Sequence, residues 1–485
     1  MNIKRNYLYN LAFQVLIMIL PLITVPYVSR VLKPEGVGTF AYTDSIVRYF
    51  ILFGMLGIGI YGNKMVAMVR DDKIQLSKTF FSIYYLQLLL TGISLIAYLI
   101  FVIFFFDEYK VIALLQTLAL LACVIDCSWF FSGLEQFKKI VTRNIIIKIA
   151  SLIAIFIFVK RPDDLMLYTV ILGLSTFFGQ LVMWISVKEY VIPVRVKFRE
   201  VIDHTKPTLI YFLPQIAIQI YFAIDKTMLG IFSGTSEVGI YDYADKVLKI
   251  AVAVVTSLGT VMLPRMANVF AKGDLEKANS YITKSLDFST LIAIPIMFGL
   301  AGTAKEFIPW FLGEEFNRSA SVLIILSPAI FLMAWSGVFG TQYLVPLGKM
   351  KEYNISVYMG AIVNLIINFI LIRPFGAIGA AIGTLCAEFA VVLVQIIFTR
   401  DQMDIKKIAK KSSYYLIAGI VMFSMLRLIG EAMGSSILTT FIQVMIGILI
   451  YVTIVIIFES YSKEGLILTE IKKVWLRLKN KTSHL

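Results

Sequence analysis

Two acid–base pairs with helical spacing stand out in a chain that is otherwise strongly apolar. Asp44 and Arg48 are four residues apart, and so are Asp245 and Lys249. Residues at i and i+4 share one face of a helix, so each acid can orient its base and offset part of the cost of removing that base from water. We therefore predict that both bases line a cavity and offer cationic contacts to an anionic headgroup. The alternative for Arg48 is that its long side chain reaches the membrane interface.

Further charged residues lie close to these pairs. The apolar segment that precedes each pair ends with a base, which is Arg30 in the first half of the chain and Lys226, next to Asp225, in the second. These three residues join the candidate substrate-binding set, although some of the pairs must serve to hold the bundle together. Asp242 and Lys246 form another pair at i and i+4 on a different face, which we interpret as packing.

Two lone acids, Asp126 and Glu388, fall deep inside apolar segments. Either acid is a candidate proton or Na⁺ site, because burial can raise the pKa of a carboxyl group into the working range. The alternative is a protonated, hydrogen-bonded acid in the core. The two histidines, His204 and His484, fall in segments predicted to be cytoplasmic, so a proton relay would use carboxylates. No metal-binding cluster, Ser-His-Asp set or ATP-binding loop is recognisable, and we predict no cofactor beyond possible Na⁺ or H⁺ coupling.

The elements that must position these residues are membrane-spanning helices. The 485 residues are 59% hydrophobic and only 16% charged, with a mean hydropathy of +0.83, against about 25% charged residues in a soluble domain. This balance excludes a soluble enzyme, a nucleic-acid binder or a secreted scaffold, despite the net charge of +14. Long apolar runs that satisfy their own backbone in lipid must be helices.

We predict an all-α integral membrane protein with about 14 transmembrane helices. The expected spans are 8–31, 40–62, 80–105, 111–133, 143–159, 165–187, 207–233, 240–264, 286–304, 320–344, 355–372, 376–398, 413–429 and 437–458. Of the 45 Lys and Arg residues, 32 fall in one set of alternate segments, nine in the other and four within spans. Basic residues concentrate on the cytoplasmic side, so this asymmetry predicts that both termini are cytoplasmic.

An internal repeat relates the two halves of the chain. A shift of 201 residues aligns Val37–Asp44 with Val238–Asp245, with Val, Gly, Tyr and Asp identical at four of the eight positions. Each block opens the second helix of its half. An even number of helices per half preserves orientation, so this is a parallel repeat. Two like halves facing each other across a cleft is a transporter architecture. The longest predicted inner linker, 188–206, separates six helices from eight.

Several short motifs, taken in order, resemble those of Wzx-type polysaccharide flippases of the multidrug/oligosaccharidyl-lipid/polysaccharide exporter superfamily. They are Pro26–Leu32, Pro34–Gly38, Asp225–Gly230, Glu237–Tyr241 and Gly259–Arg265. The resemblance covers nearly the whole chain. It implies two pseudo-symmetric six-helix lobes around a central cavity and an extra pair of helices at the C-terminus. The expected divisions are 1–190 for the N-terminal lobe, 191–206 for a cytoplasmic linker, 207–400 for the C-terminal lobe, 401–460 for helices 13 and 14, and 461–485 for a basic amphipathic cytoplasmic tail.

The resemblance also implies a function. It predicts a non-enzymatic flippase of the bacterial inner membrane that moves undecaprenyl-diphosphate-linked oligosaccharides, the repeat units of O-antigen, capsule or exopolysaccharide, from the inner to the outer leaflet. By analogy with lipid II flippases, cationic side chains in the cavity would bind the diphosphate. Those flippases are similar only in fold, so assigning Arg48 and Lys249 to this role is our inference from the residues. Partners would be the lipid-linked oligosaccharide, the bilayer and, for polymer export, a polymerase and chain-length proteins.

Two alternatives remain at this point. A multidrug cation antiporter of the same superfamily would need an acidic, aromatic site, whereas most intramembrane acids here stand beside a base. A membrane-embedded polysaccharide polymerase or ligase would need catalytic groups in a sizeable outer loop. The longest predicted outer loop, about 305–318, is too short for such a domain.

Overall fold

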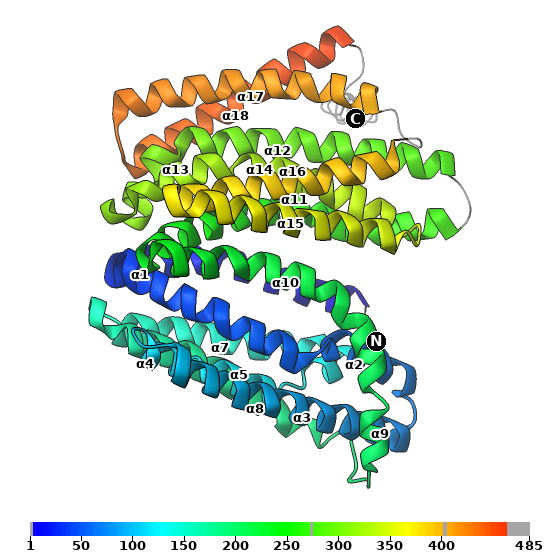
Figure 1. Cartoon of the computed structure of the whole chain (residues 1–485). Coiled ribbons are helices and arrows are strands. Elements are labelled where there is room, and N and C mark those ends of the chain that lie inside the picture. The colour runs from blue at the N-terminus through cyan, green and yellow to red at the C-terminus, as the bar shows by residue number, and fades with distance from the viewer. Residues whose placement is uncertain (1–2, 272–274, 401–404, 463–485) are drawn as a thin grey trace, which may run out of the picture. The chain divides into compact units, whose positions relative to one another are not determined.

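The computed structural model describes residues 3–271, 275–400 and 405–462, and these residues contain helices and no strand (Figure 1). The helices up to residue 271 are α1 (Ile3–Met55), α2 (Ile58–Val69), α3 (Lys73–Phe105), α4 (Lys110–Leu115), α5 (Thr117–Val124), α6 (Ser128–Gly133), α7 (Phe137–Phe158), η1 (Pro162–Asp164), α8 (Leu165–Val187), α9 (Phe198–Ile202), α10 (Thr205–Ser233) and α11 (Thr235–Ala271). Those that follow are α12 (Leu275–Leu312), η2 (Glu314–Phe316), α13 (Asn317–Leu326), α14 (Pro328–Ser336), the π-helix η3 (Gly337–Leu344), α15 (Met350–Phe375), α16 (Ala377–Thr399), α17 (Ile405–Met433) and α18 (Ile437–Ser462). The predicted tail lies almost entirely outside the described residues.

The predicted class, an all-helical multi-pass membrane protein, is confirmed, but the predicted count of 14 spans is not. Among the described residues, ten helices are long and apolar enough to cross a membrane, or eleven if the pair Glu314–Leu326 and Pro328–Leu344, bent by 44°, is one span. The predicted boundaries differ most where helices join or break. The first two predicted spans meet within α1, and the fourth is divided among α4, α5 and α6. The predicted outer loop at 305–318 is mostly helix, since α12 continues to Leu312.

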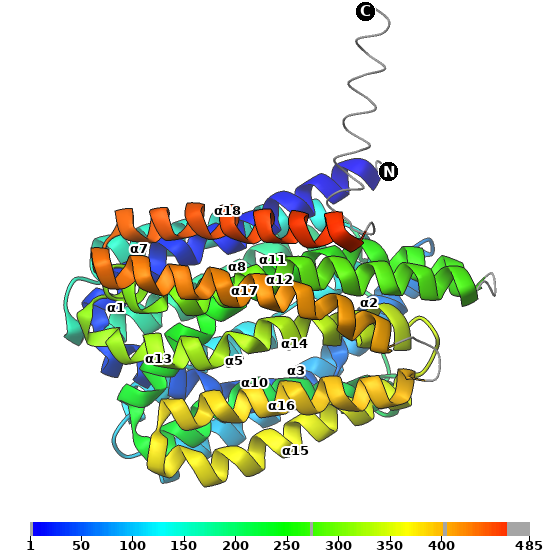
Figure 2. The same ribbon diagram turned by 90° about the horizontal axis from the view of Figure 1, so that it is seen from above.

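The chain forms two compact units, Met1–Asp242 and Tyr243–Leu485. In the first unit α1 packs against α3, α7 and α10, and α8 packs against α5 and α7. In the second unit α15 lies against α16 along its length, and α12 packs against α17, α13 and α14. Figure 2 shows α15 and α16 side by side. The two helices approach closely at Gly383 of α16, where a Cβ would lie 2.0 Å from Oδ1 of Asn368 in α15.

Polar side chains satisfy the backbone where the fourth span breaks. The Gln87 side chain in α3 donates through Nε2 to the carbonyl oxygens of Cys123 (2.7 Å) and Asp126 (2.8 Å), and its Oε1 accepts from Nε1 of Trp129 (2.9 Å). Carbonyl groups without a helical partner are costly away from water, so this one amide stabilises an interruption in a membrane helix.

The segment before α10 is fixed by His204. Its Nδ1 lies 2.6 Å from the Tyr61 hydroxyl in α2, and its Nε2 lies 2.9 Å from the Ser82 hydroxyl in α3. Burial lowers the pKa of His204 below its usual value, although nearby Asp203 opposes this. The neutral ring therefore ties the start of α10 to two helices of the first unit.

The internal repeat has a structural counterpart at the start of each repeat block. Lys33 has φ 58° and ψ 175° inside α1, and Gly234 has φ 86° and ψ 166° between α10 and α11. The shift of 201 residues that aligns the two sequences also aligns these two positions. Both halves therefore turn sharply at the same place, with a helix restarting at Pro34 in one and at Thr235 in the other. This backbone region is normally restricted to glycine, so Lys33 carries strain that Gly234 does not.

The two restarted helices cross with their backbones in contact. A Cβ on Gly38 would lie 1.7 Å from the carbonyl oxygen of Thr235, and a Cβ on Gly239 would lie 2.0 Å from that of Pro34. Gly38 and Gly239 are equivalent in the repeat, and so are Pro34 and Thr235, so the contact is nearly two-fold symmetric. Only glycine permits this approach, which explains why the repeat retains glycine in both blocks.

In the second unit, two ion pairs join α17 to α12. Near one end of α12, Asp287 pairs with Lys411 and accepts a hydrogen bond of 2.9 Å from the Tyr415 hydroxyl. Nineteen residues farther along the helix, Glu306 accepts two bonds of 2.9 Å from Nη1 of Arg427. The charge of Arg427, within the span of α17, is thus compensated by a carboxylate on a neighbouring helix.

The glycine crossing gives the first prediction. Gly38→Ala and Gly239→Ala should each destabilise the protein by about 2 kcal/mol or more, since the added methyl groups meet backbone that cannot rotate away. Gly92→Ala is the matched control, because no atom lies within 4 Å of the Cβ position at Gly92 in α3. The measurement is the midpoint temperature of thermal unfolding of the detergent-solubilised protein, monitored by fluorescence-detected size-exclusion chromatography. Equal midpoints for Gly38→Ala and Gly92→Ala would show that the backbones are not in contact.

Candidate anion-binding site

The first predicted acid–base pair forms as expected. Arg48 donates through Nε to Oδ2 of Asp44 at 2.6 Å. The Arg48 side chain is 62% exposed and that of Asp44 is 24% exposed. Among the described residues, neither terminal Nη atom of Arg48 has a hydrogen-bond partner. Asp44 therefore fixes the direction of the guanidinium group, and the two Nη atoms can donate to another anion.

The equivalent pair on α11 has the same geometry. Nζ of Lys249 lies 2.6 Å from Oδ2 of Asp245. The Lys249 side chain is 43% exposed, whereas that of Asp245 is 10% exposed. In both halves, then, the acid is the more covered partner and the base the more accessible one. This repetition argues against chance snorkelling of a single side chain.

A third ion pair differs because it is buried. Nζ of Lys226 on α10 lies 2.5 Å from Oδ1 of Asp242 on α11, with side-chain exposures of only 18% and 2%. The neighbouring Asp225 is also buried and accepts a hydrogen bond of 2.6 Å from the Tyr241 hydroxyl. Both contacts join α10 to the first turns of α11. The sequence placed Asp225 and Lys226 in the binding site, but the charge of Lys226 is opposed by Asp242 across a helix contact.

Hydroxyl groups that the sequence analysis missed connect the first pair to α10. The Thr227 hydroxyl lies 2.8 Å from that of Ser45 and 3.1 Å from that of Tyr49. Ser45 and Tyr49 follow Asp44 and Arg48 by one residue each, so this chain of hydroxyls fixes the rotation of α1 beside α10. Their types carry no distinctive signal in the sequence. Only the position of Thr227 directly after Lys226 could have suggested a contact.

The remaining candidates lie in different settings. Arg30 is exposed and donates to the Pro26 carbonyl oxygen at 2.9 Å. Asp126 is at the break between α5 and α6, where its Oδ1 accepts from the backbone nitrogen of Ser128 at 2.8 Å and so caps α6. Glu388, on α16, is only 7% exposed. The structure thus gives Asp126 a backbone-capping role, which sequence alone did not suggest.

Comparison with known proteins places this arrangement in a family. The family described as polysaccharide biosynthesis protein matches residues 3–270, and the MatE family matches residues 211–372. The "Putative O-antigen transporter" of Escherichia coli (strain K12) is 25% identical over 405 residues, covering 83% of this chain and 97% of that protein. The "Probable low-salt glycan biosynthesis flippase Agl15" of Haloferax volcanii is 26% identical over 240 residues, covering 49% of this chain and 51% of its own length.

A solved structure is similar in fold over nearly the whole chain. It is that of "Lipid II flippase MurJ, inward closed conformation", with a TM-score of 0.77 at 18% identity, covering 94% of this chain and all of that one. At this identity the likeness is one of fold.

The contrast between buried and exposed pairs gives the second prediction. Asp242→Asn should destabilise the protein by about 2–3 kcal/mol, because it leaves the covered Lys226 ammonium without its carboxylate. Asp44→Asn should cost about 1 kcal/mol or less, because Arg48 is largely exposed. Thermal unfolding in detergent compares the two variants, and the double variant Lys226→Met/Asp242→Leu should recover most of the loss. If Asp242→Asn were no worse than Asp44→Asn, the charge of Lys226 would be compensated elsewhere, and Lys226 would return to the list of anion-binding cations.

Proposed function

Because the chain belongs to the polysaccharide biosynthesis protein family, we propose that it is a flippase for undecaprenyl-diphosphate-linked oligosaccharides, carrying them from the inner to the outer leaflet by alternating access. It acts as a transporter and not as an enzyme. Relatives named as an O-antigen transporter and as a glycan flippase support this assignment, as does the fold it shares with a lipid II flippase.

The observation that carries the proposal is the Arg48 guanidinium group. It is 62% exposed and oriented by Asp44 through Nε. A diphosphate presents several anionic oxygens, and a guanidinium donates to such oxygens through two parallel N–H groups at fixed geometry. A site built for a cationic drug would instead expose the acid and cover the base.

The other cations divide by exposure. Lys249 repeats the arrangement of Arg48 and supplies a second, point-charge contact to the diphosphate or the first sugar. Arg30, which is exposed, remains a candidate for a peripheral contact with the headgroup. We assign Asp225, Lys226 and Asp242 to holding α10 against α11, and Asp44 and Asp245 to orienting the two bases.

Of Asp126 and Glu388, Glu388 is the better candidate for ion coupling. Its position on α16 lies between two close contacts with α15, Gly383 against Asn368 and Gln395 with Ser356 at 3.2 Å. A charged carboxylate buried there is expensive, so proton or Na⁺ binding would change the stability of this helix pair. The Asp126 carboxylate already accepts a hydrogen bond from the first residue of α6, so it is a less suitable coupling site than Glu388.

The remaining expectations are part of the same proposal. Such a flippase resides in the bacterial inner membrane with both termini in the cytoplasm, as the distribution of Lys and Arg predicts. It operates as two lobes, 1–190 and 207–400, with helices 401–460 as an addition. Where the product is polymerised, it works beside a polymerase and chain-length proteins.

The third prediction tests the anion site in the host cell. Replacing the protein with Arg48→Gln should lower flipping about tenfold, the value of losing one charge-assisted contact, and Lys249→Gln should act in the same direction. Lipid-linked repeat units should then accumulate on the inner leaflet, out of reach of a membrane-impermeant lectin or glycosidase. Arg70→Gln is the matched control, because Arg70 forms an exposed ion pair of 2.8 Å with Glu135 away from this site.

Other outcomes of this experiment would lead elsewhere. Unpolymerised units accumulating on the outer leaflet of depleted cells would place the protein at a later step and reject the flippase proposal. Depletion without any accumulation, together with lost efflux of a cationic dye, would favour the drug-antiporter alternative. Wild-type flipping by both Arg48→Gln and Lys249→Gln would leave a flippase whose anion site lies elsewhere.

The fourth prediction concerns coupling. Glu388→Gln mimics the protonated acid, so flipping should become insensitive to dissipation of the proton or Na⁺ gradient and slow about tenfold. The measurement is the flipping rate in energised vesicles with and without ionophores. Glu431→Gln is the control, since Glu431 on α17 is 68% exposed. A Glu388→Gln variant that still responds to the gradient as the wild type does would remove Glu388 from the coupling mechanism.

A further inference from the structure

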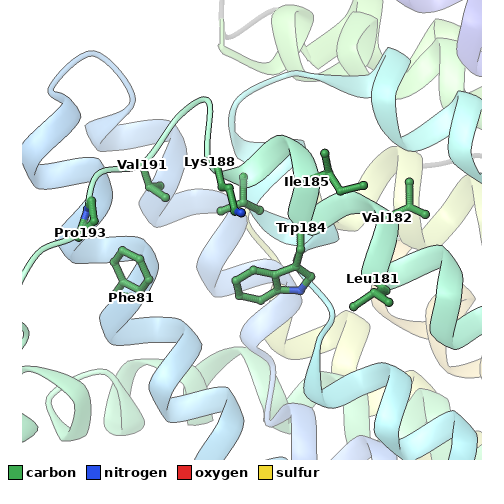
Figure 3. A pocket seen from close by; sticks show the side chains of 9 residues that line it. Phe81, Leu181, Val182, Trp184, Ile185, Lys188, Val191 and Pro193 are labelled. Carbon is green, nitrogen blue, oxygen red and sulfur yellow. The ribbon is translucent and has the colours of Figure 1, made fainter.

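A groove of about 790 Å³ opens on the first unit where α8 ends (Figure 3). We call it the α3–α8 groove. Its lining, from α3, α8 and the segment after α8, is apolar except for one lysine: Phe81, Leu181, Val182, Trp184, Ile185, Val187, Lys188, Val191 and Pro193. The volume falls within the range of about 300–1,000 Å³ that is typical of small-molecule sites.

The walls of the groove are held by specific hydrogen bonds. The backbone nitrogen of Ile192 donates to the Ser77 hydroxyl at 2.9 Å, which fixes the segment carrying Val191 and Pro193 against α3. On the other side, Nε1 of Trp184 donates to the Ile125 carbonyl oxygen at 2.8 Å. The indole ring therefore has a fixed orientation. These hydrogen bonds fix both walls and therefore define the shape of the groove.

The groove lies at the level where a membrane helix leaves the hydrocarbon. Helix α8 belongs to a predicted span that ends at Val187, and Lys188 follows directly. The lining residues of α8 include Ile185, which is 72% exposed on an apolar helix, and we expect this side chain to face lipid. Figure 3 shows Lys188 at the end of α8, with Ile185 and Val182 farther along the helix. Acyl chains therefore have direct access to the groove from the bilayer.

The charge at this end of the groove is positive. Lys188 is exposed, and no carboxylate of the described residues lies within ion-pair distance of its Nζ atom. The neighbouring acid, Glu189, is already paired with Lys139 at 2.5 Å, and Lys139 also lies over the Tyr190 ring, 4.9 Å from its centroid. Because Glu189 is neutralised in this way, the charge of Lys188 remains to attract an anion at the membrane surface.

We propose that the α3–α8 groove binds one acyl chain of an anionic membrane phospholipid, with the phosphate of that lipid on Lys188. The apolar walls suit a hydrocarbon acyl chain, and the single positive charge of Lys188 beside them suits a single phosphate group. The diphosphate of the transported lipid has its own candidate cations in Arg48 and Lys249, so the groove is a separate lipid site. This proposal needs only a membrane-embedded chain and is independent of what the protein transports.

The test is native mass spectrometry of the purified full-length chain released from detergent with equal amounts of phosphatidylglycerol and phosphatidylcholine. The wild type should retain phosphatidylglycerol preferentially. Lys188→Gln should reduce that preference about fivefold without changing retention of phosphatidylcholine. Ile185→Trp, which fills the groove but keeps the charge, should reduce retention of both lipids.

Matched controls separate this site from general effects. Lys206→Gln removes an exposed base at the start of α10, and Ile157→Trp enlarges a side chain on α7 that is 57% exposed and does not line the groove. Loss of phosphatidylglycerol that is no greater in Lys188→Gln than in Lys206→Gln would overturn the proposal. So would unchanged retention in Ile185→Trp. Displacement of phosphatidylglycerol by equimolar polyprenyl phosphate in the wild type, but not in Lys188→Gln, would assign the groove to the transported lipid class instead.

Discussion

The contact between the two repeat helices at Gly38 and Gly239 is the constraint on which the rest of the candidate site depends. Backbone meets backbone there, with hydrogen atoms in place of side chains. Asp44 follows Gly38 by six residues, about 9 Å along a helix, and Asp242 follows Gly239 by three. Close to this crossing, the Lys226–Asp242 pair joins α10 to α11 and the Thr227–Ser45 bond joins α10 to α1. A side chain at either glycine would meet the backbone of the other helix and push the two helices apart.

The exposure of a basic side chain in this protein can be compared with the position of its acidic partner. Where a base is covered, as Lys226 and Arg427 are, a carboxylate on another helix compensates it, and the pair joins two helices. At the candidate anion site the base is accessible, as Arg48 and Lys249 are, and the acid lies one turn earlier on the same helix. A pair within one helix does not depend on a neighbour, so it survives movement between helices. This division suits a transporter, in which binding groups must stay oriented while parts of the bundle move.

The second unit shows how additional helices are joined to such a bundle. Asp287 and Glu306, on one helix, hold α17 near both of its ends through Lys411 and Arg427. Both pairs are largely covered, so removal of one partner would leave a charge in a poorly solvated place. The helix pair α17–α18 is thereby fixed to α12 by specific contacts in addition to apolar packing, which alone provides little specificity between helices in lipid.

The sequence by itself determined the features that depend on local geometry. Composition and long apolar runs were enough to predict membrane-spanning helices. The spacing of Asp44 with Arg48 and of Asp245 with Lys249 was enough to predict their pairing, since rise and turn per residue are fixed in a helix. The repeated block located the restart of the second helix in each half, although it did not reveal the matching backbone at Lys33 and Gly234.

Tertiary structure decided everything that depends on which helices are neighbours. The partner of Asp242 is Lys226, sixteen residues earlier on another helix, and no periodicity encodes that separation. Asp126 looked like a buried acid in an unbroken span, but the span is interrupted beside it and its carboxylate caps the next helix. The exposure that separates Arg48 from Lys226, two bases of similar sequence setting, is likewise set by packing. The physical reason is the same in each case: burial and contact between helices come from the crossing of distant segments, which local spacing does not specify.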